Sequence, residues 1–108
     1  MPVKMKELPF SERPYEKLEM YGASNLSNSE LLAIIIKSGT KEDTSVTLAQ
    51  KVLNLKGKRE DLKFLQDIAI EDFMSIKGIG KVKAIQLKAV CEIAKRMSRP
   101  LREFKNSN

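Results

Sequence analysis

The chain has 108 residues, one cysteine and no histidine, and it carries a net charge of +6 at pH 7. A chain of this length forms about one domain, and it lacks the residues for an intramolecular disulfide, the usual zinc sites or a Ser-His or Cys-His nucleophile. We therefore expect neither an enzyme nor a cofactor binder. No stretch reaches the roughly 18 apolar residues of a membrane span, and the first ten residues lack the apolar core of a signal peptide. With a single cysteine, the expected compartment is the cytoplasm.

Three helices are predicted in the first half of the chain. The first begins at Pro14, which suits a first helical turn, and ends before Gly22, which suits the residue after the last turn. The segment Ser27-Asn28-Ser29-Glu30 has the S-x-x-E form of a capping box, and it opens a second helix that should stop at Ser38-Gly39-Thr40. Apolar residues at helical spacing from Val46 onward predict a third helix.

The second half of the chain predicts three more helical segments. A short helix over 62–68 connects to another that begins at Glu71-Asp72. The turn 77–80 ends this helix, and a final helix runs over 81–97, before Pro100. No segment alternates with a period of two residues for long enough to form a strand, so the predicted fold is all-α.

The predicted final helix has two different faces. Its apolar residues at helical spacing predict a stripe buried against the core, made of Val82, Ile85, Ala89 and Ile93. Its basic residues predict a solvent-facing row on the opposite side, made of Lys81, Lys88, Lys95 and Arg99.

The positive charge is concentrated in one part of the sequence. Residues 76–99 contain seven basic side chains and a single acid, Glu92, whereas residues 1–75 are close to neutral. Such a run is often only a solvated surface. A near-neutral body with one basic element is also the electrostatic pattern of a nucleic-acid binder.

The turn Gly78-Ile79-Gly80 is the candidate binding site. Glycine permits a positive φ and has no Cβ, so backbone N–H groups can approach an anion, and the following helix N-terminus attracts phosphate. Ile79 should insert between the two helices. Lys81 and Lys83 lie in a first helical turn, where cations are unfavourable unless an external anion is bound. The predicted DNA-backbone site comprises Gly78, Ile79, Gly80, Lys81, Lys83, Lys77 and Lys88. The simpler alternative is a tight turn with solvated lysines.

A helix, a glycine-containing turn and a second helix occur twice, around 38–40 and around 78–80. Two such units stacked about a pseudo-twofold axis would share one core. The first turn is longer and poorer in glycine, so Ser38, Gly39 and Thr40 form a possible but degenerate second hairpin. We divide the chain into an N-terminal arm and helix (1–24), a tandem domain (25–99) and a tail (100–108).

Two parts of the sequence resemble known families. The run from Ile76 to Ala84, I-K-G-I-G-K-V-K-A, resembles the helix-hairpin-helix signature of repair and recombination proteins. More narrowly, Leu8-Pro9-x-Ser11-Glu12-Arg13-Pro14, Leu26-Ser27-x-Ser29-Glu30-Leu31-Leu32 and Ser38-Gly39-Thr40 resemble the N-terminal region of the RadC family. Tyr15 departs from the basic residue expected at its position.

The resemblance implies a tandem helix-hairpin-helix bundle like the second domain of RuvA, with an extra N-terminal helix. It implies phosphate contacts at Gly78, Gly80 and Lys83, and a monovalent cation held on the carbonyl oxygens of Met74, Ile76 and Ile79. RadC proteins continue into a JAB/MPN-type domain with a His-x-His and Asp metal site. We expect that domain, and its hydrolase activity, to be absent from this chain.

Two functions follow as hypotheses. The first is binding of the DNA backbone without sequence specificity, with duplex, junction and single-stranded DNA left open. The alternative is a module that docks a protein partner or the JAB/MPN domain of its own full-length chain. The oligomeric state is expected to be a monomer or a weak dimer.

Overall fold

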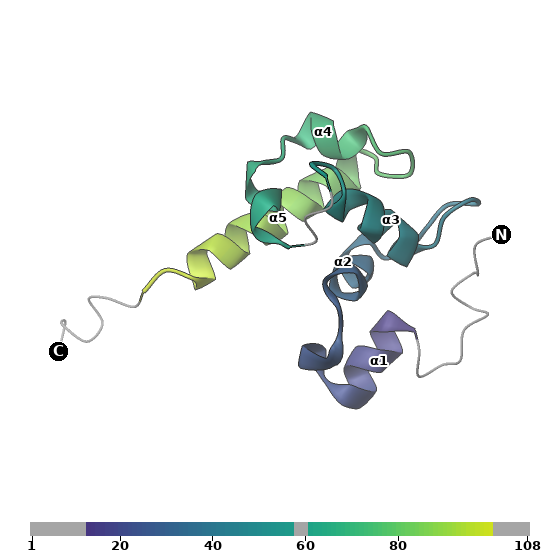
Figure 1. Cartoon of the computed structure of the whole chain (residues 1–108), viewed down its shortest axis with the longest axis vertical. Coiled ribbons are helices and arrows are strands. Elements are labelled where there is room, and N and C mark those ends of the chain that lie inside the picture. The colour runs from purple at the N-terminus through teal and green to yellow at the C-terminus, as the bar shows by residue number, and fades with distance from the viewer. Residues whose placement is uncertain (1–12, 58–60, 101–108) are drawn as a thin grey trace.

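A computed structural model describes residues 13–57 and 61–100, and over these residues the chain is all-α, as predicted (Figure 1). The elements are α1 (Pro14–Tyr21), the 3-10 helix η3 (Ala23–Asn25), α2 (Asn28–Ile36), α3 (Ser45–Leu53), the 3-10 helix η4 (Lys63–Asp67), α4 (Ile70–Met74) and α5 (Lys81–Met97). None of the helices in the described ranges is long and apolar enough to cross a membrane. The predicted arm over 1–12 and the tail beyond residue 100 lie outside the described residues.

The predicted helix ends are confirmed where the sequence carries a capping signal. Pro14 occupies the first turn of α1, and the N–H of Gly22 donates to the Leu18 carbonyl after its last turn. At α2, the Ser27 hydroxyl accepts the Glu30 N–H and the Glu30 carboxylate accepts the Ser27 N–H, which completes the predicted capping box. These bonds satisfy N–H groups that a helix N-terminus leaves without intrahelical partners.

Two helix–loop–helix units, α2 with α3 and α4 with α5, share a single aliphatic core, and η4 connects them (Figure 1). The core comprises Leu32, Ala33, Ile36, Leu48, Ala49, Val52, Leu53, Leu65, Ile68, Phe73, Ile76, Ile79, Ala84 and Leu87. Helix α1 contributes none of these side chains, and Pro14 is its one buried residue. α1 is therefore an accessory helix laid against α2.

The predicted buried stripe of α5 is wrong. Val82, Ile85 and Ile93 are exposed, and the helix instead buries Ala84 and Leu87. The two sets lie on opposite sides of the helix, since residues advance by 100° each along an α-helix. α5 has apolar residues on both sides, and periodicity alone does not show which side meets the core.

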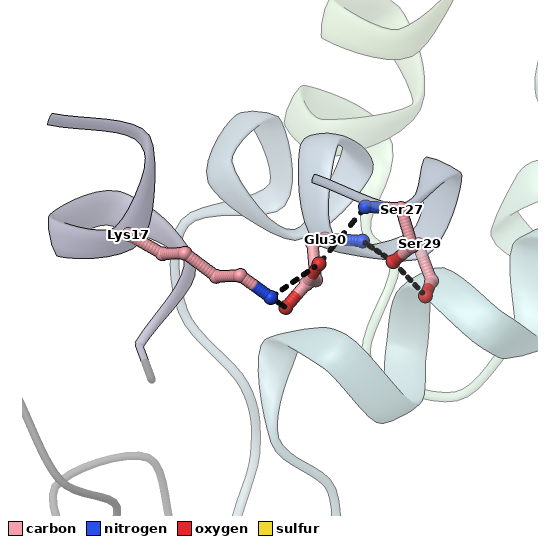
Figure 2. A network of polar contacts seen from close by, with 4 residues as sticks. All are labelled: Lys17, Ser27, Ser29 and Glu30. Atoms are coloured by element: carbon pink, nitrogen blue, oxygen red, sulfur yellow. Dashed lines mark hydrogen bonds and ion pairs between the residues drawn. The ribbon is translucent and has the colours of Figure 1, made fainter. Parts of the chain in front are cut away.

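α1 is joined to α2 by a polar network (Figure 2). The Lys17 ammonium reaches across from α1 to the Glu30 carboxylate, with Nζ 3.2 Å from Oε2. Partial burial raises the pKa of Glu30, but the hydrogen bonds from the Ser27 N–H and from Lys17 outweigh it and leave that pKa below its usual range. One carboxylate therefore caps α2 and anchors α1.

Candidate nucleic-acid interface

The hairpin between α4 and α5 is a tight turn. Ile79 is 3% exposed and belongs to the shared core, so its side chain is buried as expected. Its N–H donates to the Ile76 carbonyl at 2.9 Å and closes the turn. The backbone on either side of Ile79 is thereby held in a fixed position.

The two hairpin glycines have different surroundings. Gly78 has the expected positive φ, at 103°, and a Cβ placed there would lie 2.9 Å from Cγ2 of Thr40 and 3.0 Å from Cδ2 of Leu48. Gly80 has φ −87° and ψ −173°, so a positive φ is not the reason for glycine at this position. A Cβ on Gly80 would have no heavy atom within 4 Å. Gly78 thus faces the protein and Gly80 faces solvent.

The N-terminus of α5 is unlike those of the other helices. Within the described ranges, α5 is the α-helix that has neither a capping side chain nor an acidic residue in its first turn. Gly80 is its N-cap and supplies no side chain, and Lys81 and Lys83 follow directly. The positive end of the helix dipole therefore has no protein anion in front of it.

The predicted lysines fall into two groups. Lys77 and Lys81 are exposed beside the hairpin. The Lys83 ammonium donates to the Ser38 carbonyl at 2.8 Å, and the Lys88 ammonium donates to the carbonyls of Ile68 at 2.8 Å and Gln66 at 3.2 Å. Lys83 and Lys88 thus bond other segments of the chain, and Lys77 and Lys81 remain the hairpin lysines that project into solvent.

The possible second hairpin is a loop closed on itself. The Thr40 hydroxyl accepts the N–H groups of Glu42 at 3.2 Å and Asp43 at 3.1 Å, and the Thr40 N–H donates to the Asp43 carbonyl at 2.7 Å. A Cβ on Gly39 would overlap that same carbonyl oxygen. The Ser38 N–H is also used, in a bond to the Ile36 carbonyl. Ser38 and Thr40 thus use hydrogen bonds to shape the loop, and Gly39 lets the chain pass close to the Asp43 carbonyl.

The carbonyl set predicted to hold a monovalent cation lies at the end of α4 and in the hairpin. One of its members, the Ile76 carbonyl, already accepts the Ile79 N–H. In the part of the chain that the structure describes, no three His, Cys, Asp or Glu side chains are grouped so as to hold a metal ion. The cation remains a prediction.

The sequence did not indicate the contact between the hairpin and the α2–α3 loop. Thr40 and Leu48 lie behind Gly78, and Lys83 reaches Ser38 across 45 positions of sequence. The sequence predicts each of the two turns separately, but no spacing rule shows that they lie in contact.

Comparison with known proteins identifies the family. Residues 5–85 match the UPF0758 N-terminal family. The chain is 47% identical over 94 residues to a UPF0758 protein of Alkaliphilus oremlandii, covering 87% of this chain and 40% of that protein. It is 40% identical over 97 residues to the UPF0758 protein YsxA of Bacillus subtilis, covering 90% of this chain and 41% of that one.

The chain thus spans about two fifths of the length of these relatives. No solved structure matches it. The UPF0758 family is the RadC-like family that the sequence motifs had indicated. With most of its length matched and relatives above 40% identity, the chain belongs to the UPF0758 family and corresponds to its N-terminal domain.

Proposed function

We propose that this domain binds the sugar-phosphate backbone of DNA without reading base sequence, as a helix-hairpin-helix module of a RadC-like protein. The observation that carries the proposal is the N-terminus of α5. It is uncapped, has no acid in its first turn, and is preceded by a glycine with open space at the Cβ position.

A phosphate fits this position for physical reasons. The N–H groups of Gly78 and Gly80 have no hydrogen-bond acceptor among the described residues, and the helix dipole adds positive potential there. Lys77 and Lys81 are exposed on the two sides of Gly80 in sequence. Each charge-assisted hydrogen bond to a phosphate oxygen contributes about 1.5–3 kcal/mol net.

The absence of base reading follows from what surrounds the hairpin. Its central side chain, Ile79, is buried, and the glycines have none. Sequence reading requires side chains that reach base edges, whereas phosphate contacts only position a protein on DNA. The hairpin therefore offers contacts that every DNA sequence shares.

In the longer relatives, the domain would bring the remaining part of the protein to DNA. The RadC resemblance suggests that this part is a JAB/MPN-type domain with a metal-dependent hydrolase site. Any such activity belongs to residues outside this chain, and the role proposed for the present residues is binding alone.

A salt titration tests the proposal. Binding to duplexes of unrelated sequence should be equal within about twofold. If three or four phosphates are neutralised, log K should fall with log salt at a slope of roughly −3 to −4. Junction and single-stranded DNA, measured in parallel, define the preferred structure. Absence of binding at low salt, or a flat salt response, would contradict the proposal.

Matched lysine variants locate the site. Lys81→Ala should reduce the slope by about one, because it removes one phosphate contact. It should also leave the fold intact, since it removes a cation from the first helical turn. Lys95→Ala, near the other end of α5, is the control and should leave the slope nearly unchanged. Equal changes in both variants would show a diffuse basic surface instead of a hairpin site.

A further inference from the structure

One side of α5 carries apolar residues that stay largely exposed in the described part of the protein. We call this side the outer face, and it comprises Val82, Ile85, Ala89, Ile93 and Met97. Four of these side chains are large and strongly exposed: Val82 at 69%, Ile85 at 46%, Ile93 at 56% and Met97 at 79%. Their spacing of three, four, four and four residues keeps them in one row along the helix.

The outer face of α5 is not the side of the helix that packs into the core. The opposite side of α5 already fills that position with Ala84 and Leu87, which are almost fully buried. Beyond Cys91 every described residue of the helix is exposed, and this end of α5 extends away from the other helices (Figure 1). A continuous exposed apolar row of this kind indicates an interaction surface.

The surroundings of the outer face are positively charged. Lys81, Lys95, Arg96 and Arg99 flank the row along the helix, and Glu92 is the one acid between 76 and 99. The Arg96 guanidinium lies 2.9 Å from the Glu92 carboxylate and holds the pKa of that carboxyl below its usual range. Glu92 therefore stays ionised and paired, and among the described residues the other charges beside the row are all positive.

These charges argue against a second copy of the chain as the partner. Two α5 helices packed antiparallel by their outer faces would bring their basic edges together, and like charges in contact are unfavourable. An anionic membrane would match the charge, but membrane-surface helices use Trp, Phe and Leu on their apolar side. The outer face has none of these and has the small Ala89 at its centre, which leaves room for a side chain from a packed helix.

We propose that the outer face of α5 docks an amphipathic α-helix of a partner protein, one whose apolar stripe is flanked by Asp and Glu. The row covers sixteen residues, about 22 Å of helix, which accommodates roughly four turns of a partner. Its spacing presents the anchor pattern by which helices recognise one another. The acidic flanks of the partner would pair with Lys95 and Arg99.

This inference does not depend on DNA binding. The hairpin lies at the N-terminal end of α5, whereas Ile93 and Met97 lie near the C-terminal end. The distal half of the outer face can thus be altered without touching Gly80. The failure of one proposal is therefore distinguishable from the failure of the other.

The test uses two synthetic helical peptides of 18 residues with the same Leu stripe, one flanked by Glu and the other by Lys. The whole chain should bind the Glu peptide, in fluorescence anisotropy, at least tenfold more tightly than the Lys peptide. The double variant Ile93→Gln with Met97→Gln should lose at least tenfold in affinity for the Glu peptide while binding DNA as before. Met20→Gln, an equally exposed apolar position on α1, is the matched control and should change nothing.

Several results would overturn the inference. Equal binding of the Glu peptide by the double variant and the unmodified chain would show that the outer face is not involved. Sedimentation that reveals a dimer lost in the double variant would assign the face to a second copy. Binding to phosphatidylserine vesicles that depends on Ile93 and Met97, without binding to the Glu peptide, would assign it to a membrane.

Discussion

The two interhelical turns of this domain occupy equivalent places in their helix–loop–helix units, but their backbone N–H groups are treated differently. The α2–α3 loop is closed by its own bonds, in which the Thr40 hydroxyl accepts the N–H groups of Glu42 and Asp43 and the Asp43 carbonyl accepts the Thr40 N–H. The α4–α5 hairpin is shorter and leaves the N–H groups of Gly78 and Gly80 without acceptors among the described residues. A turn held closed by bonds across it supports the fold, and a turn with open space beside its backbone, as at Gly80, can take a ligand.

Replacing glycine by alanine in each turn distinguishes a turn that supports the fold from one that can bind a ligand. Gly39→Ala should cause the largest loss of stability. Its Cβ would overlap the Asp43 carbonyl oxygen and lie 2.8 Å from the Cα of Thr44, both of which are backbone atoms. Because backbone cannot move aside cheaply, we expect a loss of about 2–4 kcal/mol in the free energy of unfolding. Chemical denaturation followed by circular dichroism measures it. A loss below about 0.5 kcal/mol would show that the loop is not held closed.

Gly78→Ala should have an intermediate effect. The residue has a φ of 103°, and the added methyl would press on Thr40 and Leu48 side chains, which can shift. We expect a loss of about 1–3 kcal/mol, corresponding to roughly 4–8 °C in Tm per kcal/mol. Gly80→Ala is the matched control and should lose no more than about 0.5–1 kcal/mol, the difference between glycine and alanine as an N-cap, because nothing lies near its Cβ position. Equal losses of stability in the two variants would contradict the conclusion that Gly78 faces the protein and Gly80 faces solvent.

Gly80→Val should affect binding and spare the fold. The valine side chain would occupy the space through which a phosphate reaches the hairpin backbone, and Gly80 has a φ of −87° that valine can adopt. We expect DNA affinity to fall more than tenfold, or about 1.4 kcal/mol, while stability falls by no more than about 1 kcal/mol, because valine is a poorer N-cap than glycine. Lys95→Ala should cost severalfold less. A folded Gly80→Val variant with normal affinity, beside a weakened Lys95→Ala, would transfer the site to the helix face.

Lys83→Met should have the smallest effect. It removes the hydrogen bond from Lys83 to the Ser38 carbonyl, the bond that joins α5 to the α2–α3 loop, and keeps a side chain of similar length. We expect a loss of about 0.5–1 kcal/mol in stability, since the bond is exposed. The resemblance to helix-hairpin-helix proteins implied a phosphate contact for Lys83. A large loss of DNA affinity at unchanged stability would support that role over the structural one.

The elements of the fold were predictable because their signals are local. The capping box at Ser27, Pro14 at the start of α1 and the glycine turn before Lys81 each act within four residues. The buried side of α5 was not predictable, because Val82 and Leu87 belong to two apolar rows of similar strength. The choice between those rows is made by tertiary packing against α4 and η4.

The candidate site likewise has features that the sequence predicts and features that it does not. The hairpin, the burial of Ile79 and the exposure of Lys77 followed from the motif and its position between two helices. The engagement of Lys83 and Lys88 with distant carbonyls did not, since a lysine in sequence gives no sign of which chain segment lies within its reach. Charge alone therefore does not show which lysines also bond other parts of the chain.

The bond between α1 and α2 makes the domain sensitive to acid in one place. Glu30 has a lowered pKa in the folded state, so its contribution to stability is complete above the unfolded value of about 4.3 and is lost as the pH falls through the lowered one. Protonation removes the ion pair with Lys17 and weakens the attachment of α1, which carries both tyrosines of the chain, Tyr15 and Tyr21. Tyrosine ring signals in NMR should therefore report detachment of α1 before the rest unfolds, and Glu30→Gln should remove that early step by loosening α1 at every pH.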